Sequence, residues 1–385
     1  MTSPFLMCTI IDNRRRVRNR ESWNVKAAVV WKPGEKITIE EISINKPVGR
    51  EVLIRTAYAG VCHSDLHFAD ATYPFPLPYI PGHESSGVVE AVGPDVTHVK
   101  PGDHVVTCLS VFCGCCPQCV TGRPNLCESV DIKLPPGVAR RLFLNGEVVH
   151  QFANLSSFAE QMLVHENALV KIDRDIPLDR AALVGCGVLT GVGAVIHAAK
   201  VKPGATVAVI GCGGVGLSVV SGARLAGAGR IIAIDRLENK LALARQLGAT
   251  DTINAAETDA VAAVMELSAG GVPYSFEALG LKSTAEQAYA MLKPGGVATI
   301  LGMFKPGMKL ELEASTFIKD RRIQGSSMGS NQFRVDIPDL LQFYKQGRLD
   351  LDLLITDHIR LDQINEAYEK LYAGSPVRQM IVLNG

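Results

Sequence analysis

Residues 205–235 decide the fold of this chain: ATVAVIGCGGVGLSVVSGARLAGAGRIIAID. An apolar run rich in β-branched residues leads into a glycine turn, a segment of small residues follows, and a second apolar run ends on Asp235. This order predicts a strand, a tight turn, a helix and a second strand. We therefore expect an α/β domain with a doubly wound parallel sheet around these residues.

The glycine turn has the spacing of a dinucleotide-binding motif, with Gly211, Gly213 and Gly216 at the three marked positions. The first glycine would allow the tight turn, the second a close approach of backbone to a pyrophosphate, and the third close packing of helix on strand. The helix that begins near Gly214 and Val215 would offer unpaired N–H groups to the phosphates. The turn is therefore predicted to bind a dinucleotide.

Asp235 ends the second strand, where a carboxylate can accept hydrogen bonds from both ribose hydroxyls. This acid favours NAD over NADP, although Arg236 beside it leaves some room for NADP. A glycine turn by itself is a weak signal, because such turns occur in many α/β domains. The flanking strand, helix and acid make the prediction specific.

Length and charge describe a chain long enough for two domains. It has 385 residues, with 39 basic and 39 acidic side chains. The balanced charge gives no electrostatic case for a nucleic-acid partner, so a small molecule is the expected partner. Residues 181–199 and 204–223 are uncharged and long enough to cross a membrane, but their glycine content favours a buried core, and we expect no membrane partner.

Residues 1–24 are predicted to form a disordered or non-native extension. A short apolar piece precedes five arginines between Arg14 and Arg20, which reverses the order found in a secretory signal. Asp12 and Glu21 interrupt the pattern of a transit peptide. A cytoplasmic location is the resulting expectation.

The remaining chain has two regions that differ in their pattern of predicted strands and helices. Short strand-like runs separated by Pro and Gly predict a mostly β domain over residues 25–188. Its predicted strands are residues 26–31, 37–44, 51–59, 87–92, 104–109 and 158–164. Strands alternate with helical patterns over residues 189–329, as in a doubly wound domain, and residues 330–385 are expected to return to the first domain.

Five of the ten cysteines fall between Cys113 and Cys127, and such crowding favours a metal over disulfides. Cys113, Cys116, Cys119 and Cys127 follow a C-x-x-C-x-x-C-x7-C pattern. Four thiolates can close a tetrahedral shell around zinc without an open position, so the predicted zinc is structural. Cys115 blurs the register, and an iron–sulfur cluster is the chief alternative, because it also uses cysteines at two-residue spacing.

A second set of candidate ligands is dispersed over residues 62–67 (CHSDLH), 82–84 (GHE) and 185–187 (GCG). Two cysteines and one histidine can hold zinc and leave the fourth position for water or substrate, the arrangement of a catalytic site. Spacing alone cannot bring these three segments together. Taken singly, each is more often a core thiol or a satisfied histidine.

From Val25 to the C-terminus the chain resembles the zinc-dependent medium-chain alcohol dehydrogenases, because these segments, the four-cysteine loop and the glycine turn occur in the family's order and spacing. The resemblance implies a GroES-like β-barrel catalytic domain, residues 25–188 and 330–385, interrupted by a Rossmann domain at residues 189–329. It implies reversible hydride transfer between an alcohol and NAD. Two zinc ions per chain, one catalytic and one structural, and a homodimer, with a tetramer as the alternative, are also expected.

Carried over position by position, the resemblance makes Cys62, His83 and Cys186 the catalytic zinc ligands. Glu84 would be a nearby carboxylate able to exchange with the substrate oxygen at the metal. Asp65 would orient the ligand histidine and increase its basicity.

The resemblance also assigns a proton relay and the remaining cofactor contacts. Ser64 and His67 match residues that pass the alcohol proton through the cofactor ribose to solvent, a task that suits an imidazole. The contacts to the dinucleotide outside the glycine turn and Asp235 would come from His63, Thr190, Lys240 and Arg378.

Three positions depart from the family pattern. His63 replaces an arginine that grips the pyrophosphate in several members, and we expect weaker cofactor binding at alkaline pH in consequence. Leu109 stands where members often place an aromatic, which suggests a roomier pocket for bulky or aromatic alcohols. Asp131 replaces an arginine of the glutathione-dependent formaldehyde dehydrogenases, so that activity is the disfavoured alternative. A catalytically idle binding protein on the same scaffold is the alternative from another class.

Overall fold

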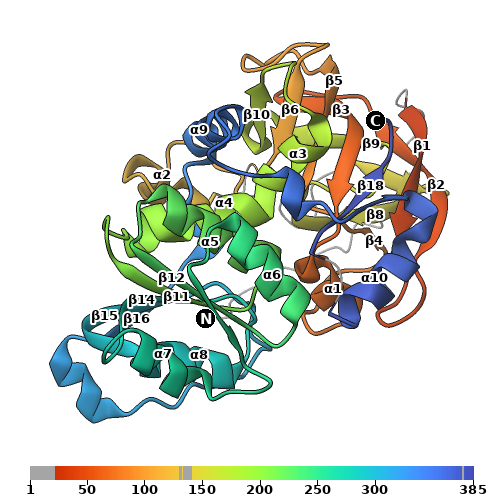
Figure 1. Ribbon diagram of the computed structural model, residues 1–385. Coiled ribbons are helices and arrows are strands. Elements are labelled where there is room, and N and C mark those ends of the chain that lie inside the picture. Colours follow the sequence, from red (N-terminus) through yellow and green to blue (C-terminus); the bar gives the residue numbers. More distant parts are fainter. Residues whose placement is uncertain (1–21, 130–131, 133–140, 375–376) are drawn as a thin grey trace, which may run out of the picture.

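The computed structural model describes residues 22–129, 132, 141–374 and 377–385. Figure 1 shows two lobes: a lobe of curled sheets built from the N-terminal half and the C-terminal segment, and a lobe built around a parallel sheet. This architecture confirms the predicted fold class. Asp131 and residues 1–21 of the predicted extension lie outside the described residues.

The parallel sheet has six strands in the order β13-β12-β11-β14-β15-β16, and every described pair is parallel. The strands are β11 (Thr206–Ile210), β12 (Arg230–Asp235), β13 (Asp251–Asn254), β14 (Val272–Glu277), β15 (Leu292–Ile300) and β16 (Arg322–Gly325). The strand order reverses between β11 and β14. Ligands of doubly wound sheets bind at the carboxyl ends of strands beside such a switch point.

Helices cover both faces of this sheet because its strands are apolar on both sides. Val207 and Val209 of β11 face one core cluster, and Ala208 and Ile210 face another. The first cluster includes residues of α5 (Gly214–Leu225) and α6 (Glu238–Leu247), and the second includes residues of α7 (Ala260–Leu267) and α8 (Lys282–Ala290). The period-two alternation of β11 therefore separates two cores.

The other lobe contains two curled sheets, with orders β1-β2-β7-β8-β4 and β10-β6-β5-β3-β18-β17, and β9 pairs with β3. The strands are β1 (Ser22–Val29), β2 (Thr38–Asn45), β3 (Glu51–Gly60), β4 (Tyr79–Ile80), β5 (Ser85–Val92), β6 (His104–Thr107), β7 (Leu142–Leu144), β8 (Glu147–Gln151), β9 (Gln161–His165), β10 (Leu169–Ile172), β17 (Asp357–Arg360) and β18 (Gln379–Val382). Because β18 pairs antiparallel with β3, the C-terminal segment does return to the first lobe.

The predicted boundaries shift in two places. Residues 22–24 belong to β1, where they pair with residues 43–45, so the prediction of a disordered extension up to residue 24 was too long. The predicted boundary between residues 188 and 189 falls inside a continuous helix, Leu178–Ala199. This helix alone among the described residues is long and apolar enough to cross a membrane, but 83% of its apolar window is buried inside the protein.

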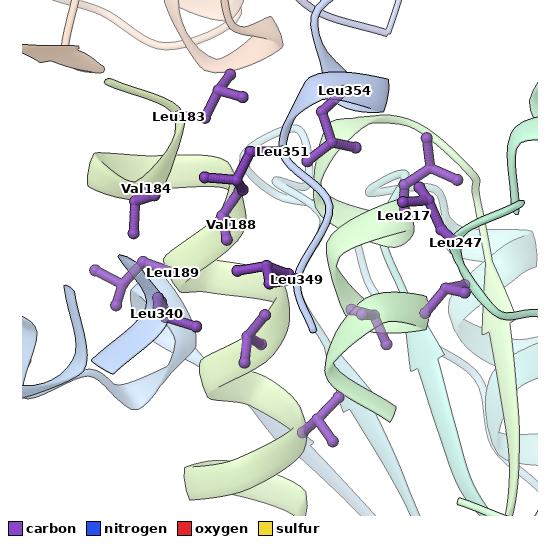
Figure 2. Packing of buried hydrophobic residues seen from close by; sticks show 14 of the residues in the cluster. Leu183, Val184, Val188, Leu189, Leu217, Leu247, Leu340, Leu349, Leu351 and Leu354 are labelled. Carbon is purple, nitrogen blue, oxygen red and sulfur yellow. The ribbon is translucent and has the colours of Figure 1, made fainter. Parts of the chain in front are cut away.

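The long helix is covered by the C-terminal segment and by α5. Figure 2 shows Val188 of this helix beside Leu349 and Leu351, which follow α9 (Phe333–Lys345) in sequence, and Leu189 beside Leu340 of α9. The leucines after α9 belong to the same cluster as Val207 and Val209 of the parallel sheet. The two lobes therefore share one core at this helix.

Candidate active site

The three glycines of the turn are required for three different reasons. Gly211 has φ +92°, a left-handed conformation that side chains disfavour. A Cβ on Gly216 would lie 1.7 Å from the carbonyl oxygen of Gly211, so the helix can pack on the strand only without it. A Cβ on Gly213 would meet no atom within 4 Å. This open space would let a bound pyrophosphate approach the backbone of the turn.

Asp235 lies at the end of β12 with its carboxylate held by backbone donors. Its Oδ2 accepts from Cys212 N–H at 2.7 Å, and its Oδ1 accepts from Arg236 N–H at 2.8 Å and Leu237 N–H at 3.1 Å. The acid is thereby tied to the glycine turn. It lines a cleft of about 640 Å³ together with Lys240, Leu279, Leu281 and Thr284.

Three dispersed candidate ligands meet in a second site. Cys62 immediately precedes α1 (His63–Ala69), His83 follows β4, and Cys186 lies on the long helix. Their ligand atoms all lie within 4.8 Å of one another, and His83 Nε2 is 3.2 Å from Cys186 Sγ. All three residues are at most 5% exposed. Two sulfurs and one nitrogen at these distances fit a single zinc ion with its fourth position free.

The helix around Cys186 has a local π-type turn over Val184–Val188, a distortion often found at functional sites. The glycines on either side of the cysteine permit close contacts there. A Cβ on Gly185 would lie 2.3 Å from the carbonyl oxygen of Thr107, and one on Gly187 would lie 2.6 Å from Arg378 Nη2. The GCG triplet therefore lets Cys186 reach the cluster from a buried helix.

Asp65 holds His83 as predicted. Its Oδ1 lies 2.9 Å from His83 Nδ1 and accepts from Gly82 N–H at 3.0 Å, and its Oδ2 accepts from Cys62 N–H at 3.3 Å. When Nδ1 donates to Asp65, the lone pair of Nε2 points to the two sulfurs. Burial lowers the pKa of His83, but Asp65 outweighs it and raises that pKa well above the ordinary value.

The sulfurs of Cys62 and Cys186 lie within 4.8 Å of each other. This contact lowers the pKa of Cys62 well below its usual range and raises the pKa of Cys186, with burial adding to the second shift. Only one of the two therefore ionises readily by itself. A cation at the centre would stabilise both thiolates, which is the donor chemistry that zinc requires.

The structure does not bring Glu84 into the cluster of ligand atoms. Its Oε1 lies 3.3 Å from Arg378 Nε in an ion pair, and its Oε2 accepts from Gly187 N–H at 3.2 Å. Burial raises the pKa of Glu84 to about 7, although Arg378 opposes the shift. Its predicted exchange at the metal would require release from these partners.

Arg378 connects the metal site with the glycine turn. It donates to the carbonyl of Val61 at 2.9 Å and is 6% exposed. A Cβ on Gly214 would lie 2.7 Å from its Nη2, so the guanidinium lies against the first residue of α5. Burial lowers the pKa of Arg378, but Glu84 and Cys62 raise it overall. A cation at a helix N-terminus fits the predicted pyrophosphate contact.

The remaining predicted residues lie around these two sites. Ser64 and His67 are three residues apart on α1, and Ser64 Oγ is 3.7 Å from Cys62 Sγ. Thr190 is buried one turn beyond Cys186, with its hydroxyl 3.6 Å from Met328 Sδ.

The side chain of His63 is exposed, yet surrounding protein desolvates it and lowers its pKa; nearby Arg378 adds to this shift, while Cys62 opposes it. Because its pKa is lowered, His63 loses its positive charge at lower pH than an ordinary imidazole does.

Sequence reasoning missed an aromatic group beside the metal site. Phe152 lies 6.0 Å from the His83 ring and 4.8 Å from Phe68. Tyr73 stacks on Phe68 and donates its hydroxyl to the carbonyl of Phe304, which follows β15 in the other lobe. Phe68 is on α1, Tyr73 follows that helix, and Phe152 begins a separate short turn, so their spacing gives no periodic signal. Leu109, by contrast, is partly buried against the core of the curled sheets.

The cysteine loop forms a compact four-sulfur site. Cys116 Sγ lies 3.5 Å from Cys119 Sγ and 3.9 Å from Cys127 Sγ, and Cys113 Sγ lies 3.9 Å from Cys119 Sγ. Zinc–sulfur bonds of about 2.3 Å in a tetrahedron place sulfurs about 3.8 Å apart. A cluster that binds each cysteine to a different iron would separate them further. Cys115 is exposed and outside this group, so the register is that of the predicted ligands.

Comparison with known proteins agrees with this geometry. The alcohol dehydrogenase GroES-like domain matches residues 49–174, and the zinc-binding dehydrogenase domain matches residues 214–346. Alcohol dehydrogenase 1 of Trifolium repens is 35% identical over 365 residues, covering 92% of this chain and 96% of that protein.

Two solved structures are similar along nearly their whole length. Benzyl alcohol dehydrogenase from Acinetobacter calcoaceticus is 35% identical with a TM-score of 0.89, covering 94% of this chain and 99% of that one. A zinc-binding dehydrogenase from Sinorhizobium meliloti bound to NADP is 28% identical with a TM-score of 0.78, covering 94% and 99%.

A parallel-sheet lobe with a nucleotide cleft, joined to a barrel lobe with a Cys–His–Cys site, defines an oxidoreductase that acts on alcohols. The chain belongs to the zinc-dependent medium-chain alcohol dehydrogenase family, as its sequence predicted.

Proposed function

We propose that the protein is an NAD-linked alcohol dehydrogenase with one catalytic and one structural zinc ion per chain. The observation that carries the proposal is that Arg378 lies against both Glu84, which follows His83 in sequence, and Gly214 of the glycine turn. A reactant held at Cys62, His83 and Cys186 would lie next to a nicotinamide whose pyrophosphate binds α5. Hydride transfer needs this proximity.

The chain's own residues supply binding, orientation and proton movement. Zinc, when bound, lowers the pKa of a bound oxygen so that an alcohol can lose its proton near neutral pH. Asp65 holds His83 in the tautomer that leaves Nε2 free. In this proposal Ser64, which lies beside Cys62, accepts the alcohol proton, and His67 on the same helix passes it to solvent. Asp235 and the glycine turn orient the dinucleotide.

Metal analysis and a chelation assay test this function. We expect two zinc ions per chain and reduction of NAD by a panel of alcohols, with the rate lost after removal of the catalytic zinc and restored by its return. A catalytically idle protein would give no rate before or after chelation. A chain that turned over alcohols with no zinc would also refute the proposal.

Preference for NAD over NADP rests on Asp235. Its carboxylate lines the cleft where a ribose hydroxyl would bind, and a 2′-phosphate there would meet its negative charge. Arg236 and Lys240 are nearby cations that could favour NADP instead. We expect a larger kcat/KM with NAD, and Asp235→Asn should narrow the difference. A larger kcat/KM with NADP in the parent enzyme would reverse the assignment.

We propose a primary or secondary alcohol as substrate, with bulky or aromatic alcohols favoured. The solved relative named as a benzyl alcohol dehydrogenase supports an aromatic substrate, and the aromatic group around Phe152 lies beside His83. A glutathione adduct of formaldehyde is the disfavoured alternative. A kcat/KM profile that ranked short primary alcohols far above benzyl alcohol would refute this preference.

A homodimer in the cytoplasm completes the proposal, with a small molecule as partner rather than nucleic acid or membrane. Within the part of the chain that the structure describes, the edge strand β16 pairs with β15 alone, and Met308, Phe317 and Ile318 are exposed in the connection before it. Exposed apolar side chains beside a free strand edge favour association. Mass in solution tests it, because a monomer would contradict the dimer and a tetramer would extend it.

A further inference from the structure

Glu277 occupies a special place in the parallel sheet. It is the last residue of β14 and pairs in register with Ile210, the last residue of β11 before the glycine turn. Ile234 next to Asp235 is level with Ile210 on the opposite side of β11. Two strand-terminal acids, Asp235 and Glu277, therefore flank the strand that carries the turn.

The side chain of Glu277 is fully buried and uses one oxygen for three hydrogen bonds. Its Oε1 accepts from Leu279 N–H at 2.9 Å, Gly280 N–H at 2.8 Å and the Thr284 hydroxyl at 2.7 Å. Its Oε2 has no hydrogen-bond partner among the described residues and faces Gly302, whose added Cβ would lie 2.7 Å away. A buried carboxylate with so asymmetric a set of donors indicates a fixed orientation.

The main chain of Glu277 holds the neighbouring strand end as well. Its carbonyl accepts from Leu301 N–H at 2.8 Å and Gly302 N–H at 3.2 Å. A Cβ on Gly302 would lie 1.9 Å from the nitrogen of Gly280, so the loops after β14 and β15 pack backbone to backbone. Glu277 thus joins the loop after β14, the start of α8 and the end of β15.

The segment that Glu277 holds forms a wall of the nucleotide cleft. Leu279, Leu281 and Thr284 line the cleft of about 640 Å³, which also contains Asp235. A Cβ on Gly211 would lie 2.6 Å from Leu279 Cγ, so Leu279 packs directly on the glycine turn. Glu277 itself does not line the cleft, and it can act on a ligand only through these neighbours.

We propose that Glu277 is a positioning residue for the dinucleotide, which orients Leu279 and Thr284 opposite Asp235 and so shapes the wall on which the adenosine half lies. The inference rests on the proposed function, because it requires NAD in this cleft. A carboxylate suits the task since charge-assisted hydrogen bonds are stronger than neutral ones and α8 begins beside it. A glutamine could keep its carbonyl oxygen on the three donors, but the bonds would be weaker because the group is neutral, and its NH2 would take the place of Oε2 facing Gly302.

Direct binding of NAD to the zinc-loaded enzyme tests the proposal, with Glu277→Ala and Glu277→Gln compared with the parent. We expect the Kd for NAD to rise about tenfold in the alanine variant and about threefold in the glutamine variant. At saturating NAD, kcat should stay within about twofold, and zinc content should not change. Glu286→Gln, a partly buried acid on α8 that does not line the cleft, is the matched control and should leave the Kd as in the parent.

The possible outcomes distinguish failure of this inference from failure of the proposed function on which it rests. If the parent does not bind NAD, the proposed function fails. If the parent binds NAD and both Glu277 variants bind it equally well, the positioning role is refuted. It is also refuted if kcat falls along with NAD affinity, because that pattern indicates a general structural defect. Should the alanine variant fail to fold, the glutamine variant alone decides by the same measurements.

Discussion

Gly213 and Gly216 stand three residues apart in one turn, yet the structure gives them opposite surroundings. A Cβ on Gly216 would nearly coincide with the Gly211 carbonyl, whereas a Cβ on Gly213 would enter open space. Glycine is therefore needed for two different reasons, for close backbone packing at Gly216 and for ligand access at Gly213. The motif's spacing predicts these two roles, and the structure gives Gly213 the open space and Gly216 the close backbone contact.

Substitution of these glycines by alanine should separate folding from binding. Gly216→Ala should destabilise the protein by about 1–3 kcal/mol, because an overpacked backbone contact must be relieved. Gly213→Ala should leave the melting temperature unchanged and raise the Kd for NAD, because its methyl group occupies cofactor space. Thermal unfolding and NAD titration measure the two effects. Equal losses of stability in both variants would contradict this account.

Removal of the Asp65 carboxylate should weaken the catalytic metal site. Asp65→Asn keeps the shape but can present its amide N–H to His83, so the tautomer that binds metal is no longer enforced. Zinc affinity of this site should fall about 10–100-fold, measured by competition with a chelator. Asp70→Asn, at the end of the same helix, is the control and should retain parental zinc affinity. Unchanged zinc affinity in Asp65→Asn would refute the orienting role.

At the scale of elements, the cysteine loop is a small structure that metal ligands organise. Its helices, α2 (Pro117–Val120) and the turn at Pro124–Leu126, are too short to be stable alone. The loop docks on the segment between the lobes, where Asn125 Nδ2 donates to the Ser327 carbonyl and Gln332 Nε2 donates to the Gly122 carbonyl. A folded loop therefore supports the junction of the two lobes.

Cys113→Ser and Cys115→Ser should differ sharply although the residues are two apart. Cys113 is one of the four clustered sulfurs and accepts from Cys116 N–H at 3.2 Å, and backbone N–H groups lower its pKa to about 6. Loss of this thiolate should remove one zinc per chain and lower the melting temperature. Cys115→Ser should keep both zinc ions. Metal analysis and calorimetry decide, and a metal loss in Cys115→Ser would show that the register is wrong.

At the scale of the whole molecule, the long helix and α9 hold the lobes together. His197, near the end of the helix, pairs with Asp336 of α9 at 3.0 Å. The hydrogen bond to Asp336 raises the pKa of His197 against the effects of burial and of Lys200. Asp339 of α9 also faces this histidine across a shared cavity of about 190 Å³. The charge on one imidazole therefore contributes to the junction.

The contribution of His197 should depend on pH in a definite direction. Because its folded pKa is raised, the ion pair stabilises the protein fully below about pH 6.5 and loses this effect as pH rises through the folded pKa. The stability difference between parent and His197→Gln should shrink from pH 6 to pH 9. We expect this difference in the free energy of unfolding to be less than about 1 kcal/mol, because the ring is partly exposed. A difference that grows with pH would contradict the assignment.

Local patterns in the sequence determined the parallel-sheet lobe, the glycine turn, Asp235 and the four-cysteine site. Strand periodicity, glycine spacing and short cysteine spacing report interactions between residues close in the chain, so the strand that ends on Asp235 was predicted and is β12 in the structure. The assignment of Cys62, His83 and Cys186 came from resemblance, because nothing in their spacing brings three distant segments together.

Only the tertiary structure decided the features made by long-range packing. It separated Glu84 from the metal cluster, placed Arg378 between cluster and turn, and buried Glu277 behind the cleft. It also showed that one continuous helix, residues 178–199, spans the predicted domain boundary between residues 188 and 189. These contacts join residues up to hundreds of positions apart, and their formation depends on how the two lobes share a core, which no local pattern of residues encodes.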